Sequence, residues 1–299
     1  MVFFFTMQEG ERMKKLKRWL AGLFAGVMLA GIFAIPCRAE TGRRVVNPDV
    51  VSLSQGREYT NLDATGDGKA DSLFLESSRR QGLFSQGRRY LEIFINGRRA
   101  FRLGDPYYRG DVTARYEVKL CTVSRSDILF FIRTVSETDH YNFCRLYRYG
   151  NGSLQEVLDL KNTYKNIFHY RESIDVVRAG NGRIRFLWYG QMGVTGALNW
   201  TVDYVKAGGM LKRPRRTCPV LPEEEIKVWT ASRGFRVYET AKLTRESFRV
   251  LTGEKVKITN VYNDTKRFYV RVVNQKGQAG WVPCPNDYSP YFKEAVYVG

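Results

Sequence analysis

Oxygen-bearing side chains between residues 63 and 71 are spaced as in a loop that wraps one hard cation. Counted from Asp63 as position 1, the ligands at positions 1, 3, 5, 7 and 9 are Asp63, Thr65, Asp67, the Lys69 carbonyl and Asp71. Gly68 permits the sharp turn that such a loop needs. A strand-like run follows, and Phe74 stands where an EF-hand carries its bidentate glutamate, so the loop is not an EF-hand. The spacing predicts one Ca²⁺ ion, and a polar turn without a metal is the alternative.

The same loop resembles the D-x-D-G-D-G-x-x-D loops of FG-GAP and VCBS-like repeats, which belong to propeller-like exported bacterial proteins. The resemblance implies Ca²⁺ held between the strands of one blade. Thr65 replaces the usual Asp or Asn, which removes one negative charge. The equivalent stretches 122–127 and 178–183 lack this set of acids, so we expect one ion at most. Its expected affinity is about 10⁻⁴–10⁻³ M, as in other extracellular modules.

Residues from about 226 to 282 carry four segments that are similar, in order, to bacterial SH3-like (SH3b) domains. The segments are 230–232 with 235–238, 251–258, 268–272 and 277–282. The resemblance implies a small barrel of five or six strands, and members of this family commonly bind peptidoglycan. One departure is Tyr238-Glu239-Thr240, which replaces the N-V-R-x-G-P segment that usually follows the first strand.

Five aromatic residues of this C-terminal part are candidates for stacking on a sugar or peptide ligand. They are Tyr238, Tyr262, Tyr269, Trp281 and Tyr288. Tyrosine and tryptophan combine a large apolar face with one polar group, which suits such a ligand. The alternative is that Trp281 and Tyr269 are core residues of the barrel.

No catalytic constellation accompanies these segments. The chain has two histidines, His140 and His169, whereas a cysteine peptidase needs a Cys, a His and a third polar group in contact. Cys144 is close to His140 in sequence, but both lie in strand-like sequence without the strand-to-helix context of such enzymes. A zinc amidase needs more His or Glu ligands than any motif here offers. We therefore predict a protein that is not an enzyme.

The elements that must position these residues are strands almost throughout. Short alternating or aromatic-rich runs are separated by Gly, Asn and Asp turns, and the 18 Tyr and 18 Phe suit half-buried sheet surfaces. Hairpin turns built on glycine recur at 97, 152 and 209, and a second apolar strand precedes each hairpin, at 72–76, 128–132 and 184–189.

This period of about 56 residues predicts four-stranded units, each of which must stack on the next to bury its apolar face. The predicted fold is all-β, with a propeller-like domain of three four-stranded repeats followed by a small SH3-like β-barrel. A β-sandwich is the alternative to the propeller-like domain.

The N-terminus has the three parts of a secretory signal peptide. A basic run at 13–18 is followed by the uncharged apolar stretch 19–35 and by the exit Cys37-Arg38-Ala39. The pattern predicts cleavage after residue 39, with Met13 as the true start, and an uncleaved membrane anchor is the alternative. The predicted parts are a signal peptide at 1–39, the repeat domain at 40–212, a linker at 213–225 and the SH3-like domain at 226–299.

The excess of positive charge belongs to the mature chain. Removal of residues 1–39 takes away six basic and two acidic residues and leaves +14 of the original +18. For an exported protein, this charge favours anionic wall polymers, anionic lipids or acidic glycans as partners, and not nucleic acid. A charge that only keeps the protein soluble is the alternative.

Four cysteines remain after cleavage, and an even number in an exported chain permits two disulfides. Sequence order suggests that Cys121 pairs with Cys144 and that Cys218 pairs with Cys284.

Together, these features predict a secreted, envelope-associated protein that binds the cell wall. Its SH3-like domain would bind peptidoglycan or an anionic wall polymer, and its calcium-stapled β repeats would act as a scaffold. The alternative is an extracellular protein-interaction scaffold or sensor module that binds another envelope protein and no glycan.

Overall fold

The computed structural model describes residues 44–79, 89–104, 115–135, 143–160, 173–264, 267–285 and 289–297. The predicted signal peptide at 1–39, with its start at Met13, lies outside these residues, and so do His140, His169 and Tyr288. Within the described ranges, no helix is both long enough and apolar enough to cross a membrane.

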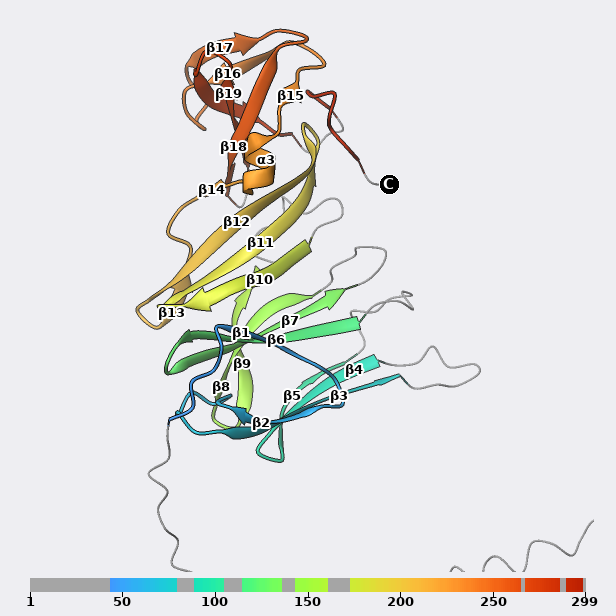
Figure 1. Ribbon diagram of the computed structural model, residues 1–299, viewed down its shortest axis with the longest axis vertical. Helices are drawn as coiled ribbons and strands as arrows, with labels where there is room; N and C mark the ends of the chain where they lie inside the picture. The colour runs from blue at the N-terminus through green and yellow to red at the C-terminus, as the bar shows by residue number, and fades with distance from the viewer. Residues whose placement is uncertain are drawn as a thin grey trace, which may run out of the picture. The chain divides into compact units, whose positions relative to one another are not determined.

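Three four-stranded antiparallel meanders follow one another along the chain (Figure 1). The first consists of β2 (Glu58–Leu62), β3 (Asp71–Arg79), β4 (Arg89–Ile95) and β5 (Arg98–Leu103). The second consists of β6 (Arg115–Ser124), β7 (Asp127–Val135), β8 (Cys144–Gly150) and β9 (Ser153–Asp159). The third consists of β10 (Ser173–Gly180), β11 (Arg183–Met192), β12 (Gly196–Ala207) and β13 (Met210–Lys212). The all-β prediction is confirmed.

The repeated hairpins of the sequence join the third and fourth strands of each meander. Asn96 and Asn151 have φ of 52°, and Gly97 and Gly152 follow with φ of 73° and 78°. Two consecutive positive φ values match the twist of a two-residue hairpin, and Asn-Gly adopts them at little cost. The predicted upstream strands at 72–76, 128–132 and 184–189 lie in β3, β7 and β11, which are the second strands of their meanders.

The N-terminal strand β1 (Val50–Leu53) joins the second meander and not the first. It pairs antiparallel with β6, from Val50 opposite Cys121 to Leu53 opposite Val118. The second sheet therefore has five strands, in the order β1-β6-β7-β8-β9.

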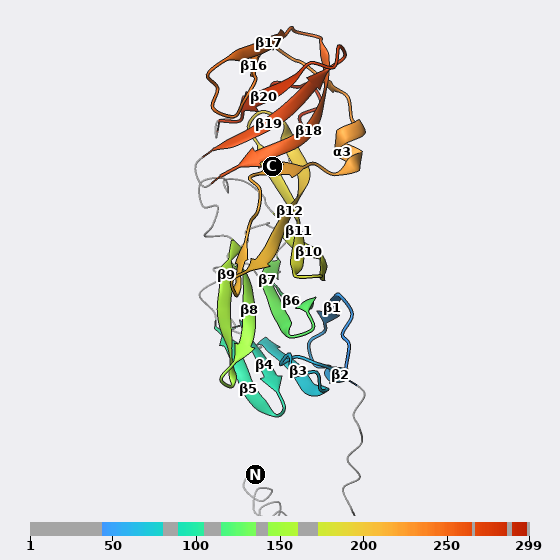
Figure 2. The same cartoon turned by 90° about the vertical axis from the view of Figure 1, so that its left-hand side faces the viewer.

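The remaining strands form a fourth antiparallel sheet, and β18, β19 and β20 lie side by side in Figure 2. It consists of β14 (Thr217–Pro219), β15 (Trp229–Thr230), β16 (Phe235–Tyr238), β17 (Glu246–Val250), β18 (Lys255–Asn263), β19 (Phe268–Asn274) and β20 (Ala279–Pro283). Its order is β14-β18-β19-β20-β16-β17, with β15 also paired to β18. The segment 213–225, expected to be a linker, contributes β14 to this sheet and a short helix, α3 (Pro222–Ile226).

One hydrophobic core is continuous from the second sheet through the third to the fourth. Trp188 and Trp200 are each 1% exposed on adjacent strands of the third sheet. The Trp200 ring lies 5.5 Å from that of Phe268 in β19, so the third and fourth sheets share this core. A second core lies between the first and second sheets and includes Leu73, Leu91 and Phe130.

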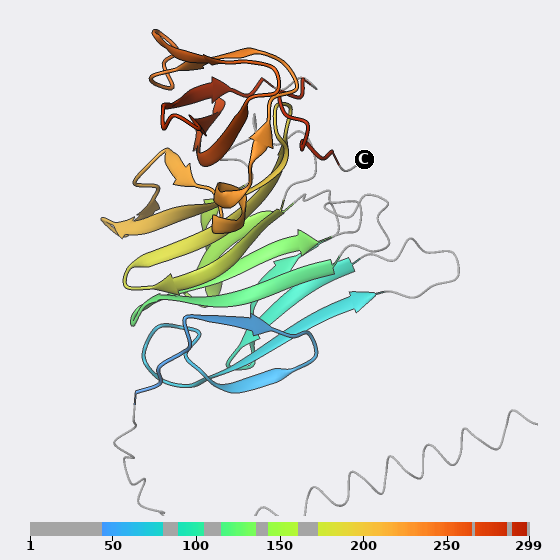
Figure 3. The ribbon, with the colours of Figure 1, turned by 45° about the horizontal axis from the view of Figure 1, so that its top comes forward.

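The C-terminal segment 289–297 is hydrogen-bonded to the turn between the long strands β11 and β12. Figure 3 shows the red end of the chain beside the yellow strands that this turn joins. Tyr291 N–H donates to the Val194 carbonyl (3.0 Å), and Ala197 N–H donates to the Val296 carbonyl (3.0 Å). Gly196 has φ of +67°, and a Cβ there would lie 2.4 Å from the Val296 oxygen. Only glycine permits this approach.

The four described cysteines are buried thiols that form no disulfide, so the suggested disulfide pairs are wrong for this structure. Cys121 lies in β6 and Cys144 in β8, with β7 between them. Strands two places apart are about 10 Å apart, whereas a disulfide needs Cα atoms within about 7 Å. Cys218 lies in β14, and Cys284 directly follows β20. Strands β18 and β19 lie between β14 and β20 in the sheet.

Candidate functional site

The predicted calcium loop connects β2 to β3 and is organised around two buried carboxylates. Asp63 and Asp71 are 2% and 5% exposed. Asp63 accepts hydrogen bonds from the N–H groups of Gly66 (2.6 Å) and Gly68 (2.7 Å). Asp71 Oδ2 accepts from the N–H groups of Ala64 (2.8 Å) and Thr65 (3.0 Å). These bonds fix the path of the loop whether or not an ion is present.

The donor set of the loop is oxygen only, as a hard cation requires. Thr65 Oγ1 is buried and has no hydrogen-bond partner, so this oxygen is available as a ligand for an ion. Asp67 is exposed and accepts a hydrogen bond from Lys69 N–H (2.8 Å), and Lys69 is exposed as well. Among the described residues, no group of three or more acidic, His or Cys side chains lies close enough to hold a metal. The oxygen chemistry fits Ca²⁺, although the carboxylates do not gather into one cluster.

The N-terminal segment 44–49 is fastened to this loop. Asn47 exchanges two hydrogen bonds with the Asp63 backbone, at 2.6 and 2.8 Å, and Val45 N–H donates to the Gly68 carbonyl (2.9 Å). The Arg44 side chain packs on Gly68, where a Cβ would lie 2.6 Å from Arg44 Nε. The loop therefore positions the segment that precedes β1.

The predicted aromatic residues of the fourth sheet come together on one face. The Tyr262 ring lies 5.7 Å from that of Tyr269 and 6.1 Å from that of Trp281. Tyr238 lies opposite Trp281 in the register of β16 and β20. Tyr238, Tyr262 and Trp281 are partly exposed, whereas Tyr269 is buried at 5%.

Strand alternation explains this face, because successive side chains point to opposite sides of a sheet. Val261, Val270 and Val282, which flank the aromatic residues along their strands, are fully buried in the core. Tyr269 is buried, as the alternative expected, but on the aromatic face and outside both core clusters. Trp281 lies on the opposite face from its buried neighbour Val282.

Basic side chains border the aromatic face. The Arg216 guanidinium lies 3.4 Å from the Tyr262 hydroxyl, and Arg267 lies 6.0 Å from the Tyr269 ring centre. Asp264 holds both arginines, at 3.9 and 3.2 Å. Aromatic rings beside fixed cations suit a ligand with both apolar ring faces and anionic groups.

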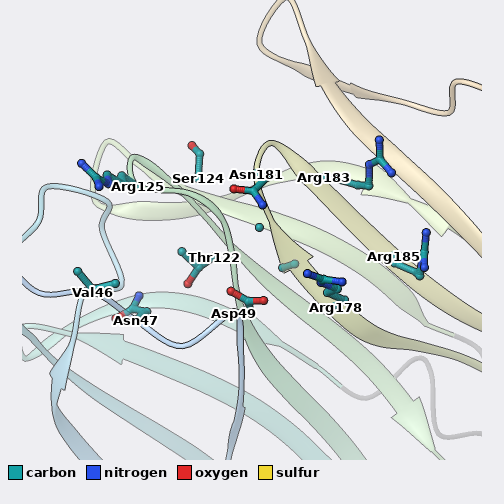
Figure 4. A pocket seen from close by; sticks show the side chains of 12 residues that line it. Val46, Asn47, Asp49, Thr122, Ser124, Arg125, Arg178, Asn181, Arg183 and Arg185 are labelled. Atoms are coloured by element: carbon teal, nitrogen blue, oxygen red, sulfur yellow. The ribbon is translucent and has the colours of Figure 1, made fainter.

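A second site, which the sequence analysis missed, lies at the first hairpins of the second and third sheets (Figure 4). It is a pocket of about 590 Å³ whose charged residues are Asp49, Arg125, Arg178, Arg183 and Arg185. The pocket residues of the second and third sheets fall in or beside the stretches 122–127 and 178–183, which correspond to the acidic loop of the first repeat. The arginines in these two stretches were the sequence feature that could have indicated this pocket.

Comparisons with known proteins assign no family to the chain. No family model matches it, and neither a curated protein nor a solved structure is significantly similar to it.

Proposed function

We propose that this protein is a non-enzymatic envelope protein that binds peptidoglycan through the aromatic face of its fourth sheet. The observation that carries the proposal is the aromatic cluster around Tyr262, whose ring centre lies 6.1 Å from that of the partly exposed Trp281 and 5.7 Å from that of the buried Tyr269. Partly exposed aromatic rings stack on the apolar faces of sugar rings, and adjacent arginines pair with peptide carboxylates.

In this proposal, the fourth sheet is an SH3-like barrel unit and the three preceding meanders are blades of an open, propeller-like scaffold. The equal spacing of the meanders and their sequential strand order support the scaffold. The four landmark segments of the SH3-like resemblance fall on β15–β16, β17–β18, β19 and β20 or directly beside them, which supports the barrel unit.

Calcium acts in this scaffold as a staple of the first blade. Asp63, Thr65, Asp67, Asp71 and the Lys69 carbonyl are the proposed ligands. The unpartnered Thr65 Oγ1 and the oxygen-only donor set support the assignment. The ion would fix the β2–β3 loop and, through Asn47, the segment before β1.

Sedimentation with purified peptidoglycan, freed of attached anionic polymers, tests the proposed function. The wild-type protein is expected to pellet at high salt, and the double variant Tyr262→Ala with Trp281→Ala is expected to stay in solution. Tyr189→Ala is the matched control, because Tyr189 is a partly exposed aromatic residue of the third sheet. Circular dichroism establishes that each variant is folded.

Equal sedimentation of the double variant and the wild type would remove the aromatic face as the binding site. If the wild-type protein does not pellet at all, the scaffold that binds an envelope protein and no glycan becomes the better reading.

A further inference from the structure

The arginine pocket gathers four guanidinium groups from two sheets. Arg125 belongs to the turn between β6 and β7, Arg178 to β10, and Arg183 and Arg185 to β11. Figure 4 shows Arg125 at the β6–β7 turn on one side of the tip of the β10–β11 hairpin, and Arg178, Arg183 and Arg185 on the other side. A volume of about 590 Å³ accommodates a small organic ligand.

Two of these arginines oppose each other across paired strands. A bulge after Val176 leaves Val177 as an extra residue and brings Arg178 opposite Arg185. Like charges directly opposite each other destabilise a sheet, and bulges are frequent where a side chain is re-aimed at a site. The bulge therefore places Arg178 next to Arg185, where a bound anion would lessen the repulsion between the two positive charges.

The acidic residues nearby leave much of this charge uncompensated. Asp203 forms a two-point ion pair with Arg185, at 2.7 and 2.9 Å, and lies 3.6 Å from Arg183. The hydrogen bond from Arg185 lowers the pKa of Asp203, so this carboxylate stays charged and committed to its pair. Within the described part of the chain, neither Arg125 nor Arg178 has an ion pair.

Backbone hydrogen bonds hold the rim in place. Thr122 N–H donates to the Asp49 carbonyl (2.9 Å), and Gly182 N–H donates to the Val123 carbonyl (2.7 Å). The first bond fixes the N-terminal segment to β6, and the second fixes the β10–β11 hairpin to the same strand. A pocket built in this way needs little ordering when it binds a ligand, which favours affinity.

The pocket also contains groups that suit hydroxyls. The Asp49 carboxylate is exposed in it, and the amide of Asn181 lies at the tip of the β10–β11 hairpin. A carboxylate next to arginines accepts hydrogen bonds from a ligand and would repel a ligand that is anionic throughout. The chemistry therefore fits a ligand that carries both an anionic group and free hydroxyls.

We propose that this pocket binds a polyol phosphate, with the phosphate at Arg178 and the neighbouring Arg183, and the hydroxyls at Asp49 and Asn181. An arginine binds phosphate oxygens through two parallel hydrogen bonds, and phosphate offers more acceptor oxygens to neighbouring arginines than a carboxylate does. The site is separate from the aromatic face and does not depend on the proposed peptidoglycan binding.

Isothermal titration of the whole protein with glycerol phosphate tests the proposal, with orthophosphate, glycerol and glycerate as comparison ligands. Glycerol phosphate is expected to bind most tightly, and Arg178→Gln is expected to weaken it by about tenfold or more, the loss of one charge-assisted contact. Arg98→Gln is the matched control, because Arg98 is an exposed strand arginine, as Arg178 is, and it lies outside the pocket.

Four results would overturn the proposal. If glycerol phosphate does not bind detectably at millimolar concentration, the pocket is not a binding site for it. If Arg178→Gln and Arg98→Gln weaken binding equally, the binding results from general surface charge and not from the pocket. If orthophosphate binds as tightly as glycerol phosphate, the polyol is not recognised. If glycerate binds as tightly, the phosphate is not required. The sedimentation test of the aromatic face uses peptidoglycan without phosphate polymers, so a failure of one test does not imply a failure of the other.

Discussion

Trp200 of β12 packs edge-on against Phe268 of β19, with ring centres 5.5 Å apart at an angle of 61°. The two residues are 1% and 5% exposed, and they belong to the third and fourth sheets. Trp200 also forms an isolated antiparallel β-bridge with Val220, just after β14, so the third and fourth sheets contact each other here through both side chains and backbone. The repeats and the C-terminal sheet are therefore joined through a shared core and not only through the chain.

Trp200→Ala is expected to destabilise both the third and the fourth sheet. Loss of a fully buried tryptophan costs about 3–5 kcal/mol of unfolding free energy, because a cavity replaces its contacts. Urea unfolding, followed by circular dichroism, measures this change. Ile226→Ala is the control, with an expected change within about 0.5 kcal/mol, because Ile226 is 73% exposed. A midpoint equal to that of the wild type would show that the ring contact does not contribute.

Calcium is expected to raise the melting temperature of the wild-type protein. With an affinity of about 10⁻⁴–10⁻³ M, 10 mM Ca²⁺ would add about 1.4–2.7 kcal/mol to the unfolding free energy. Asp67→Asn is expected to reduce this increment while leaving the melting temperature in EDTA nearly unchanged, because Asp67 is exposed. Scanning calorimetry with Ca²⁺ and with EDTA measures both quantities. A wild-type protein that melts identically in the two buffers has a polar turn and no calcium site.

The four buried thiols are expected to resist modification in the native protein. Burial raises the pKa of Cys121 to about 12, and it also raises the pKa values of Cys218 and Cys284. Because the thiolate is the reactive form, a disulfide reagent at pH 8 should leave these groups unmodified for as long as the fold persists.

In guanidinium without reductant, the four thiols are expected to react at once. Titration before and after denaturation counts them. Thiols that appear only after a reductant is added would mean that the purified protein carries disulfides, contrary to the structure.

Glu117 makes part of the stability dependent on pH. Burial alone raises its pKa, but hydrogen bonds and charge from Arg133 and Arg115 outweigh burial and lower it below the ordinary 4.5. The pair with Arg133 therefore stabilises the fold fully above about pH 4.5, and this contribution is lost as the pH falls and the carboxylate protonates.

Glu117→Gln is expected to lose about 1–3 kcal/mol at pH 7, because Arg133 then keeps a weaker partner. The difference from the wild type should shrink as the pH falls below 4.5. Urea midpoints at several pH values measure it, with the exposed Glu225→Gln as control. A difference that stays constant down to pH 3 would contradict the role of the Glu117 charge.

The strand pattern was predictable from local sequence because it depends on near neighbours. The turns at Asn96-Gly97 and Asn151-Gly152 require positive φ, and the buried runs in β7 and β11 alternate or repeat as sheets demand. These signals act within a few residues, and they indicated the second, third and fourth strands of each meander.

Contacts between distant segments were not predictable in the same way. Three such features depend on which strands become neighbours: the pairing of β1 with β6, the strand β14 in the expected linker, and the lack of disulfides among the four buried cysteines. The aromatic cluster was predicted as residues but not as one face, because Tyr238, Tyr262 and Trp281 meet only through the register of β16, β18, β19 and β20. The arginine pocket was missed because its residues come from three separate segments.

The bonds between the C-terminal segment and the β11–β12 turn impose an order on biosynthesis. Gly196 meets Val296, which follows about 100 residues later in the chain. At about 5–20 residues per second, the ribosome needs about 5–20 s to supply that partner. During this interval the Val194 carbonyl and the Ala197 N–H lack their partners in the C-terminal segment, so the turn is accessible to a chaperone or a protease that acts on the nascent chain.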